Sequence, residues 1–286
     1  MSALANRIHA TAIVEGDVRL ADDVTIGPHC VLTGPITIGV GTRLRGHAYL
    51  NGPLTIGQRN VIYPHVTLGF APQDLKWDAD VSGAGLVIGD GNTFREGVSI
   101  HRASSHETPT TIGDNNYWMA NSHAGHDCTV ANNCVFANGT LLAGFVRVDD
   151  KVITGGNSTV HQFCRVGRGA FLSGVVGMTL DLPPWFMLTG INVAGSINLK
   201  GMRRAGMSAE DINAVRWVYT TLYRRGMPPK KAVEMLRDRI DRPIVREYIQ
   251  FIEGSKRGIC LAKGKPARNT ALAVPEAIEP GDKDAD

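Results

Sequence analysis

The sequence predicts a mainly β protein, in which a solenoid of stacked six-residue repeats is followed by a small α-helical domain. The first observation is a core-type side chain at every sixth position. The second is the composition, with 33 glycines and only 6% aromatic residues in 286, which suits many thin repeated layers. The third is a change to a helical period after Ser208. At 43% hydrophobic and 20% charged residues, disorder and fibrous classes are excluded.

The repeat begins near the start of the chain. Its series runs without a gap from Ile8 to Leu68, restarts at Ile88, and runs again from Ile112 to Met178. An amphipathic helix would repeat every 3.6 residues and an ordinary strand every 2. A six-residue unit instead holds one short strand and one turn, and it buries its core only against stacked neighbours. We therefore expect a solenoid over residues 1–190.

Four of the five cysteines fit this pattern. Each of them lies four residues after a member of the series, at a small interior position: Cys30, Cys128, Cys134 and Cys164. We expect buried packing thiols there, and neither disulfides nor metal ligands.

Two segments interrupt the repeat. Residues 70–86 and 103–110 are polar or charged and lack the six-residue spacing. Insertions in a solenoid leave as loops on one face, often the binding face.

The C-terminal part has the signals of helices. Ser208-Ala-Glu-Asp211 is a helix start, and the apolar face that follows ends near Gly226. Pro228 opens a second helix, to about Asp241, and Pro243 a third, to about Gly254. We expect a helical domain over 191–260 and a disordered tail over 261–286.

Positive charge is concentrated in the helical part. Residues 200–268 have 17 basic and 7 acidic side chains, against 12 and 15 in residues 1–199. A basic helical surface predicts an acidic partner, such as an acidic carrier protein or an anionic membrane surface. Nucleic acid is disfavoured, because the basic residues lack interleaved aromatic side chains. With no apolar run of ~20 residues and no signal peptide, a cytoplasmic protein without a transmembrane segment is expected.

One histidine-rich segment is a candidate site. Residues 120–130 place His123 and His126 in one repeat, and Gly144 and Gln162 follow His126 at steps of 18 residues. If three repeats make one coil, these residues stack along one edge at ~4.8 Å per coil, with His161 beside Gln162. The spacing by itself leaves open whether this is a site or only a polar edge.

Several motifs make the choice sharper. The chain resembles the hexapeptide-repeat transferases, and among them the UDP-N-acetylglucosamine O-acyltransferases of lipid A biosynthesis (LpxA type). The motifs are His123-Ala-Gly-His126-Asp127-Cys128, Gln73-Asp74-Leu75-Lys76, His161-Gln162-Phe163-Cys164 and Gly201-Met-Arg-Arg204. The resemblance implies a left-handed parallel β-helix and a homotrimer with active sites between subunits. It also implies transfer of a 3-hydroxyacyl chain from acyl carrier protein to the sugar 3-hydroxyl, without metal or cofactor.

The resemblance also implies a role for each residue. His126 is the general base, Asp127 orients its ring, and the backbone amide of Gly144 is the candidate oxyanion donor. Gly174 sets the acyl length, with Phe171 as the alternative. The residues expected to bind substrate are Gln73, Asp74, Lys76, His123, His161, Gln162, Asn198 and Arg204.

Some alternatives stay open. The family usually has histidine at Phe145, an acidic residue at Lys200 and arginine at Ala205. These departures leave open a paralogue that acts on a different UDP-sugar or on an amino sugar. A zinc protein like the γ-carbonic anhydrases would use His101, His123 and His126. A sister N-acyltransferase typically begins with an extra N-terminal domain, whereas this repeat begins by Ile8. A non-catalytic scaffold is the last.

Overall fold

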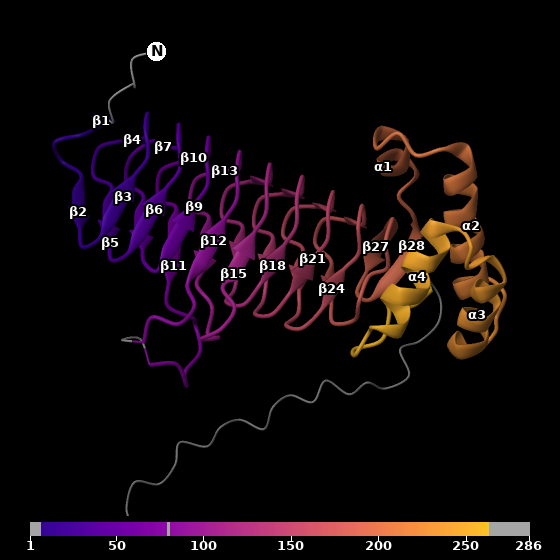
Figure 1. Ribbon diagram of the computed structural model, residues 1–286. Helices are drawn as coiled ribbons and strands as arrows, with labels where there is room; N and C mark the ends of the chain where they lie inside the picture. Colours follow the sequence, from indigo (N-terminus) through magenta and orange to yellow (C-terminus); the bar gives the residue numbers. More distant parts are fainter. Residues whose placement is uncertain (1–6, 79–80, 263–286) are drawn as a thin grey trace, which may run out of the picture.

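A computed structural model describes residues 7–78 and 81–262. Residues 7–182 wind into a parallel β-solenoid with three sheets along its sides, and the helices lie beyond its last coil (Figure 1). We name the sheets A, B and C in the order in which the chain first enters them. The solenoid predicted from the six-residue period is thus confirmed.

Sheet A has 11 strands. Its strands are β1 (Arg7–Ile8), β4 (Thr25–Ile26), β7 (Arg43–Leu44), β10 (Val61–Ile62), β13 (Thr93–Phe94), β16 (Tyr117–Trp118), β19 (Val135–Phe136), β22 (Ile153–Thr154), β25 (Phe171–Leu172), β27 (Phe186–Gly190) and β28 (Val193–Ile197). Sheet B has 9 strands. They are β2 (Ile13–Glu15), β5 (Val31–Thr33), β8 (Tyr49–Asn51), β11 (Thr67–Phe70), β14 (Ser99–His101), β17 (His123–Ala124), β20 (Leu141–Leu142), β23 (Thr159–Val160) and β26 (Gly177–Met178).

Sheet C has 8 strands. They are β3 (Val18–Leu20), β6 (Ile36–Ile38), β9 (Leu54–Ile56), β12 (Leu86–Ile88), β15 (Thr110–Ile112), β18 (Thr129–Val130), β21 (Arg147–Val148) and β24 (Arg165–Val166). Within a sheet, neighbouring strands are one coil apart: Ala124 pairs with Leu142, and Leu142 with Val160. Every strand pair is parallel except β27 with β28, an antiparallel hairpin that ends sheet A and that the repeat did not predict.

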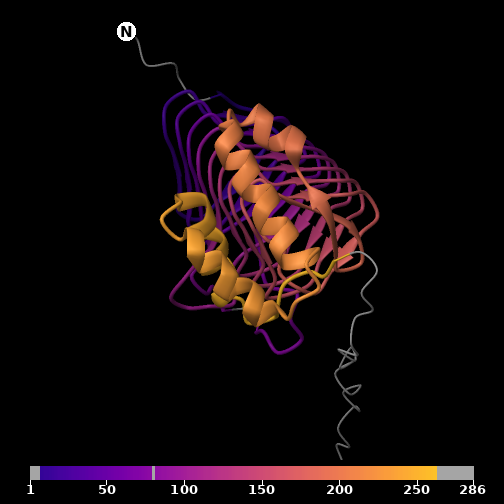
Figure 2. The same cartoon turned by 90° about the vertical axis from the view of Figure 1, so that its right-hand side faces the viewer.

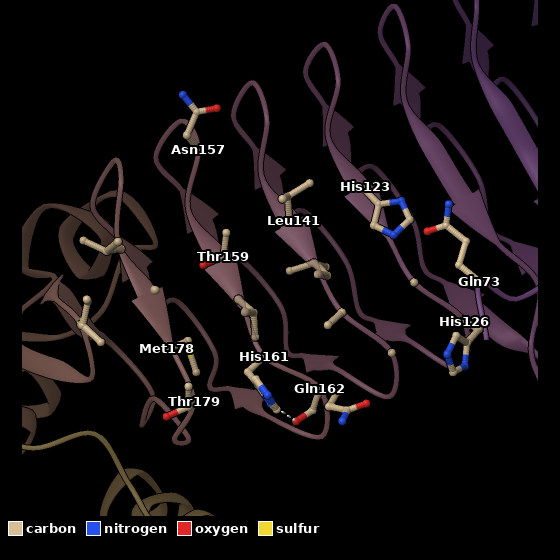
Figure 3. Close-up of a pocket in the computed structure, with 18 of the residues that line it drawn as sticks. Gln73, His123, His126, Leu141, Asn157, Thr159, His161, Gln162, Met178 and Thr179 are labelled. Atoms are coloured by element: carbon tan, nitrogen blue, oxygen red, sulfur yellow. Dashed lines mark hydrogen bonds between the residues drawn. The ribbon is translucent and has the colours of Figure 1, made fainter. Parts of the chain in front are cut away.

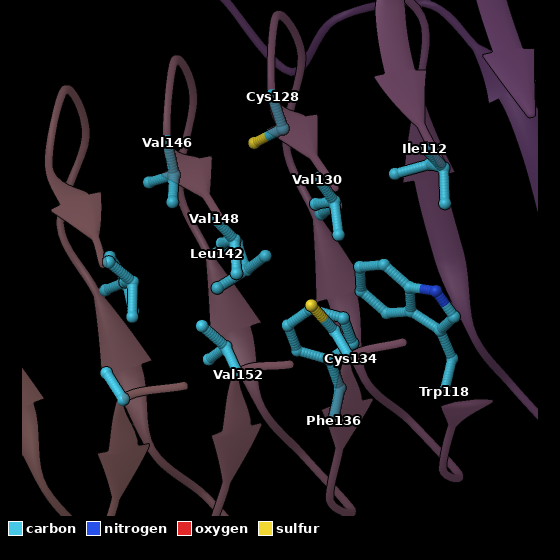
Figure 4. Close-up of a cluster of buried hydrophobic side chains, with 14 of the residues drawn as sticks. Ile112, Trp118, Cys128, Val130, Cys134, Phe136, Leu142, Val146, Val148 and Val152 are labelled. Atoms are coloured by element: carbon cyan, nitrogen blue, oxygen red, sulfur yellow. The ribbon is translucent and has the colours of Figure 1, made fainter. Parts of the chain in front are cut away.

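The repeat positions form the core. From Ile26 to Met178 each of them is buried, and Trp118 stacks against Phe136 with ring centroids 4.0 Å apart (Figure 4). The first coil is the exception, with Ile8 50% exposed, because no coil precedes it in the described residues. All five cysteines are free and buried, as expected for the four in the repeat.

Both interruptions leave the solenoid at one corner. Residues 71–85 connect β11 to β12 and residues 102–109 connect β14 to β15, so each passes from sheet B to sheet C. The longer one projects from the body (Figure 1). Buried Arg102 donates to the carbonyls of Gly69 and Val81, which ties the longer loop to the coil. The prediction of two loops on one face is confirmed.

The helical domain caps the end of the solenoid (Figure 2). Its helices are α1 (Leu199–Arg204), α2 (Ala209–Tyr223), α3 (Pro229–Leu236), the short 3₁₀ helix η1 (Arg237–Arg239) and α4 (Pro243–Glu253). Ser208 caps α2 by accepting a hydrogen bond from the Asp211 N–H, as its motif predicts. The sequence predicted three helices and missed α1, which is only 6 residues long. No helix among the described residues is long and apolar enough to span a bilayer.

Several hydrogen bonds fix the helical domain to the solenoid. Glu247 of α4 accepts two hydrogen bonds from Arg168, and the Tyr248 hydroxyl donates to the Pro184 carbonyl. Beyond α4 the chain returns to the hairpin that ends sheet A, where Leu261 pairs with Val193 of β28. Leu261 and Ala262 therefore belong to the ordered part, and the rest of the predicted tail, 263–286, lies outside the described residues.

Candidate active site

A groove of about 820 Å³ runs along the outer side of sheet B (Figure 3). Its floor is a column of outward-facing residues at successive coils: His123 pairs with Leu141, Leu141 with Thr159, and Thr159 with Gly177. The imidazoles of His101, His123 and His126 lie at one end, and His161 lies further along, beside Met178. Val175 and Ile191 at the other end are 82% and 76% exposed. One cavity thus has a histidine-rich end and an end with exposed apolar side chains.

His126 lies at the corner between β17 and β18, at the polar end of this groove. Its Nδ1 is 2.6 Å from Oδ2 of Asp127. Asp127 has a φ of 59°, which aspartate tolerates better than most residues, and this turn sets the carboxylate beside the ring. Because an ionised carboxylate only accepts, Nδ1 carries the proton and Nε2 is left as a free acceptor.

The Asp127 carboxylate lies behind the groove wall, with its side chain 6% exposed. Its Oδ2 accepts from the Ser104 N–H at 3.0 Å and the Ser104 hydroxyl at 2.6 Å, and its Oδ1 accepts from the Ser105 N–H at 3.1 Å. Burial alone would raise the pKa of Asp127, but the hydrogen bonds from His126, Ser104 and Ser105 outweigh it and lower the pKa to about 2. The group therefore stays ionised during a reaction near neutral pH.

Gly144 lies one coil beyond His126. A Cβ at this position would lie 2.9 Å from both Cε1 and Nε2 of the His126 ring, so only glycine lets the backbone come this close. Within the described residues, the Gly144 N–H has no acceptor. At the equivalent position of the corner after sheet C, the backbone N–H has a partner on the next coil. There the Asp90 N–H donates to the side chain of Asp114. Gln162 is the corresponding residue on the coil after Gly144, and its side chain does not accept from the Gly144 N–H. Among the described residues this N–H is therefore unpaired, close to the His126 ring.

Two further histidines lie on neighbouring coils. His123 Nδ1 is 2.8 Å from the Ser99 hydroxyl, and His101 Nδ1 donates to the Ala71 carbonyl at the base of the longer loop. Their rings meet edge to face at 5.4 Å. Burial lowers the pKa of both, that of His123 to about 4. Smaller contributions come from His101 and His126 for His123, and from His126 and Arg102 for His101. Both are neutral near pH 7 and can act as hydrogen-bonding groups.

The zinc alternative finds no support in this geometry. Within residues 7–78 and 81–262, no three His, Cys, Asp or Glu side chains are arranged to hold a metal ion.

Comparison with known proteins decides the family. An acyl-[acyl-carrier-protein]–UDP-N-acetylglucosamine O-acyltransferase from Ectopseudomonas mendocina is 42% identical over 255 residues, which cover 88% of this chain and 98% of the relative. The corresponding enzyme from Aliarcobacter butzleri is 38% identical over 257 residues, 89% of this chain and 98% of the relative. This chain belongs to the UDP-N-acetylglucosamine O-acyltransferase family.

Family models and solved structures agree with this membership. The model described as UDP-N-acetylglucosamine O-acyltransferase, domain 2, matches residues 181–260, and that of six hexapeptide repeats matches 109–144. The UDP-N-acetylglucosamine acyltransferase of Francisella novicida superposes with a TM-score of 0.87 at 34% identity, over 90% of this chain and 95% of that one. The Moraxella catarrhalis structure gives 0.83 at 35%, over 88% and 99%.

The groove brings together six of the residues that the resemblance to this O-acyltransferase family implied. They are Gln73, His123, His126, Gly144, His161 and Gln162. Asp74 and Lys76 are exposed on the loop that carries Gln73, and Arg204 is exposed on α1. Their roles toward substrate stay predictions.

Three expected site residues lie elsewhere. Asn198 is buried, and its carboxamide caps α1 through the Gly201 N–H and donates to the Gly169 carbonyl, so it supports the helix that carries Arg204. Phe171 is on sheet A, whereas the groove follows sheet B. Gly174 is not in the groove wall but directly precedes Val175, which is.

The sequence analysis missed several groove residues. His101 was named only as a ligand in the zinc alternative, and Thr159 was not named. Thr159 was available from the repeat, because it lies two 18-residue steps after His123. Ile191 was not, because it lies on the turn of the unpredicted β27–β28 hairpin.

Phe145, where the resemblance predicted a histidine, is the nearest of the three departures from the family pattern to the His126–Asp127 pair. Its ring meets the His126 ring edge-on, with centroids 5.3 Å apart, and stacks on Phe163 at 4.7 Å. It gives one side of the His126 ring an apolar neighbour.

Proposed function

We propose that this chain transfers a 3-hydroxyacyl group from acyl carrier protein to the 3-hydroxyl of UDP-N-acetylglucosamine, the first step of lipid A biosynthesis. The names of the relatives support the reaction. The observation that carries it is the His126–Asp127 dyad, whose ring lies close against Gly144 inside a groove with an apolar far end.

His126 performs the proton transfer. A sugar hydroxyl is a weak nucleophile at neutral pH, so Nε2 removes its proton as the oxygen attacks the thioester carbonyl. Asp127 holds the ring in the tautomer with Nε2 free and stabilises the imidazolium that forms. Since the Asp127 pKa is about 2, the carboxylate does not itself take the proton.

Gly144 stabilises the charge that develops on the thioester oxygen. Its N–H is rigidly held and unpaired, which is the arrangement that an oxyanion donor needs. Collapse of the tetrahedral intermediate forms the new ester and breaks the carbon–sulfur bond. The leaving thiolate then takes the proton from the His126 imidazolium, and the dyad returns to its starting state.

The rest of the groove matches the two substrates. The acyl chain follows the column Leu141, Thr159 and Gly177 toward Val175 and Ile191. The candidate cations for the diphosphate are exposed residues outside the groove lining: Lys76 on the loop, and Lys200 and Arg204 on α1. Because the loop and α1 lie far apart along the solenoid (Figure 1), they would meet one diphosphate from different subunits.

We also propose a cytoplasmic homotrimer with its active sites between subunits. Leu75 supports this, because the leucine at the tip of the substrate loop is 97% exposed, and exposed apolar side chains of this kind favour contact with another surface.

The direct experiment combines purified protein with 3-hydroxyacyl carrier proteins of several chain lengths and with UDP-N-acetylglucosamine. We expect an O-acylated sugar nucleotide and free carrier thiol in equal amounts by mass spectrometry. No acylated product with any chain length or UDP-sugar would contradict the proposal.

A further inference from the structure

The shorter loop, residues 102–109, closes around Asp127. The Ser104 N–H, the Ser104 hydroxyl and the Ser105 N–H all donate to the Asp127 carboxylate. At the end of the same connection, the Thr110 hydroxyl accepts from the Asp127 backbone N–H at 2.8 Å. An insertion more than 15 residues away in sequence thus holds the carboxylate that orients the general base.

The two serines play different parts in this loop. The Ser104 hydroxyl donates to Oδ2, the same oxygen that accepts from His126, and at 2.6 Å it matches the distance of the His126 bond. The Ser105 hydroxyl instead serves the loop itself, where it accepts from the N–H groups of Glu107 and Thr108. Only Ser104 places a side-chain donor on the oxygen that faces the imidazole.

The shorter loop is held in place by contacts with the longer loop. The Ala103 N–H donates to the Gly85 carbonyl, and the Ala84 N–H donates to the Ser105 carbonyl. His106 of this loop lies against Trp77 of the longer loop, with ring centroids 5.8 Å apart. Ser104 therefore has a fixed position relative to Asp127, and its hydroxyl does not depend on a mobile segment.

We propose that Ser104 is a positioning residue for the His126–Asp127 dyad, and that its hydroxyl fixes the orientation and limits the basicity of the carboxylate that faces His126. This inference rests on the proposed function. When the hydroxyl is absent, Oδ2 loses one of its three donors, the carboxylate rotates more freely, and the negative charge facing the ring is less neutralised. The ring is then less well oriented and holds a proton more readily at rest.

The other histidines near the dyad are His123, on the same coil as His126, and His101, on the preceding coil of sheet B. The thiol of Cys128, beside Asp127, has its pKa raised by burial to about 12. The pKa of each histidine is lowered by burial, that of His123 to about 4. Both are therefore neutral near pH 7, and every variant in the test keeps both of them, so a shift of the acid limb between variants reports on the dyad.

The test compares Ser104→Ala with Ser104→Thr and with the matched control Ser105→Ala, in the full-length protein. For Ser104→Ala we expect kcat to fall about tenfold, the effect of one lost hydrogen bond to a charged group, with KM for both substrates within about twofold. The midpoint of the acid limb of kcat/KM should move up by about half a pH unit. Ser104→Thr keeps a hydroxyl and should restore both quantities.

The control Ser105→Ala distinguishes an effect of the Ser104 hydroxyl from a general disturbance of the loop. It removes the bonds within the turn but keeps the Ser105 N–H on Asp127, so we expect an unshifted acid limb. An equal shift in Ser105→Ala, an unshifted limb in Ser104→Ala, or no rescue by threonine would overturn the inference. Failure of the proposed function is distinct, because then the wild-type protein gives no acyl transfer at all.

Discussion

His123 gives the protein a pH-dependent stability at the scale of a single residue. Burial holds its pKa at about 4 in the folded chain, below the ordinary 6.5. The unfolded chain therefore binds the proton first, so this contribution to stability is fully present above about pH 6.5 and is lost as the pH falls toward 4. We expect the Tm to drop between pH 7.5 and 5, and to drop less in His123→Gln. The exposed His29 serves as the control, and an equal drop in His123→Gln and His29→Gln would contradict the assignment.

Phe145 is expected to influence which sugar acceptor is used, again at the scale of a single residue. Its ring contacts the His126 imidazole and cannot hydrogen-bond, so it disfavours a polar group of the sugar at this point. We expect Phe145→His to raise kcat/KM for UDP-N-acetylglucosamine relative to its 3-amino analogue, which would be acylated on nitrogen. Competition between the two acceptors measures the ratio. A ratio that is identical in wild type and variant shows that Phe145 only packs.

At the scale of elements, the end of α2 is expected to bind the carrier protein. Arg224 and Arg225 are exposed there, in the basic part of the chain. Reversing both charges to glutamate should raise KM for the acyl carrier protein and flatten its dependence on salt. Arg43→Glu, on an exposed position of β7, is the control. An unchanged salt dependence would favour an anionic membrane surface as the partner of this helix.

The turn after β25 is expected to limit the acyl chain. A Cβ at Gly174 would meet only the backbone of Gly156, its oxygen at 3.4 Å and its nitrogen at 3.8 Å, so a larger residue is tolerated beside the apolar end of the groove. Gly174→Met should shift the preferred chain to a shorter one, since each excluded methylene forfeits about 0.8 kcal/mol of burial. Rates over a series of acyl carrier proteins measure this. Phe171→Ala, on sheet A, should leave the profile unchanged, and no shift in Gly174→Met would contradict the limit.

At the scale of the whole molecule, the regular solenoid was predictable from the sequence, whereas its irregular additions were not. One period of six residues predicted the core, and its multiple of 18 placed Gly144 and Gln162 on the coils after His126. The handedness was implied only by the resemblance. The β27–β28 hairpin has no repeat spacing, and the 6-residue α1 is too short for a helical period. The bonds from Ser104 to Asp127 arise where an insertion folds back on a later coil, and no local pattern predicts such a contact.

The most direct test of the account is the turnover of His126→Ala. The loss of a general base typically costs about 10² to 10⁴ in rate, and this side chain is at an edge of the solenoid, so its removal should leave the assembly intact. We expect acyl transfer to fall by at least about a hundredfold, while light scattering still gives three times the 30.8 kDa of one chain. Near-native turnover in a variant of the same mass would contradict the central role of the His126–Asp127 dyad.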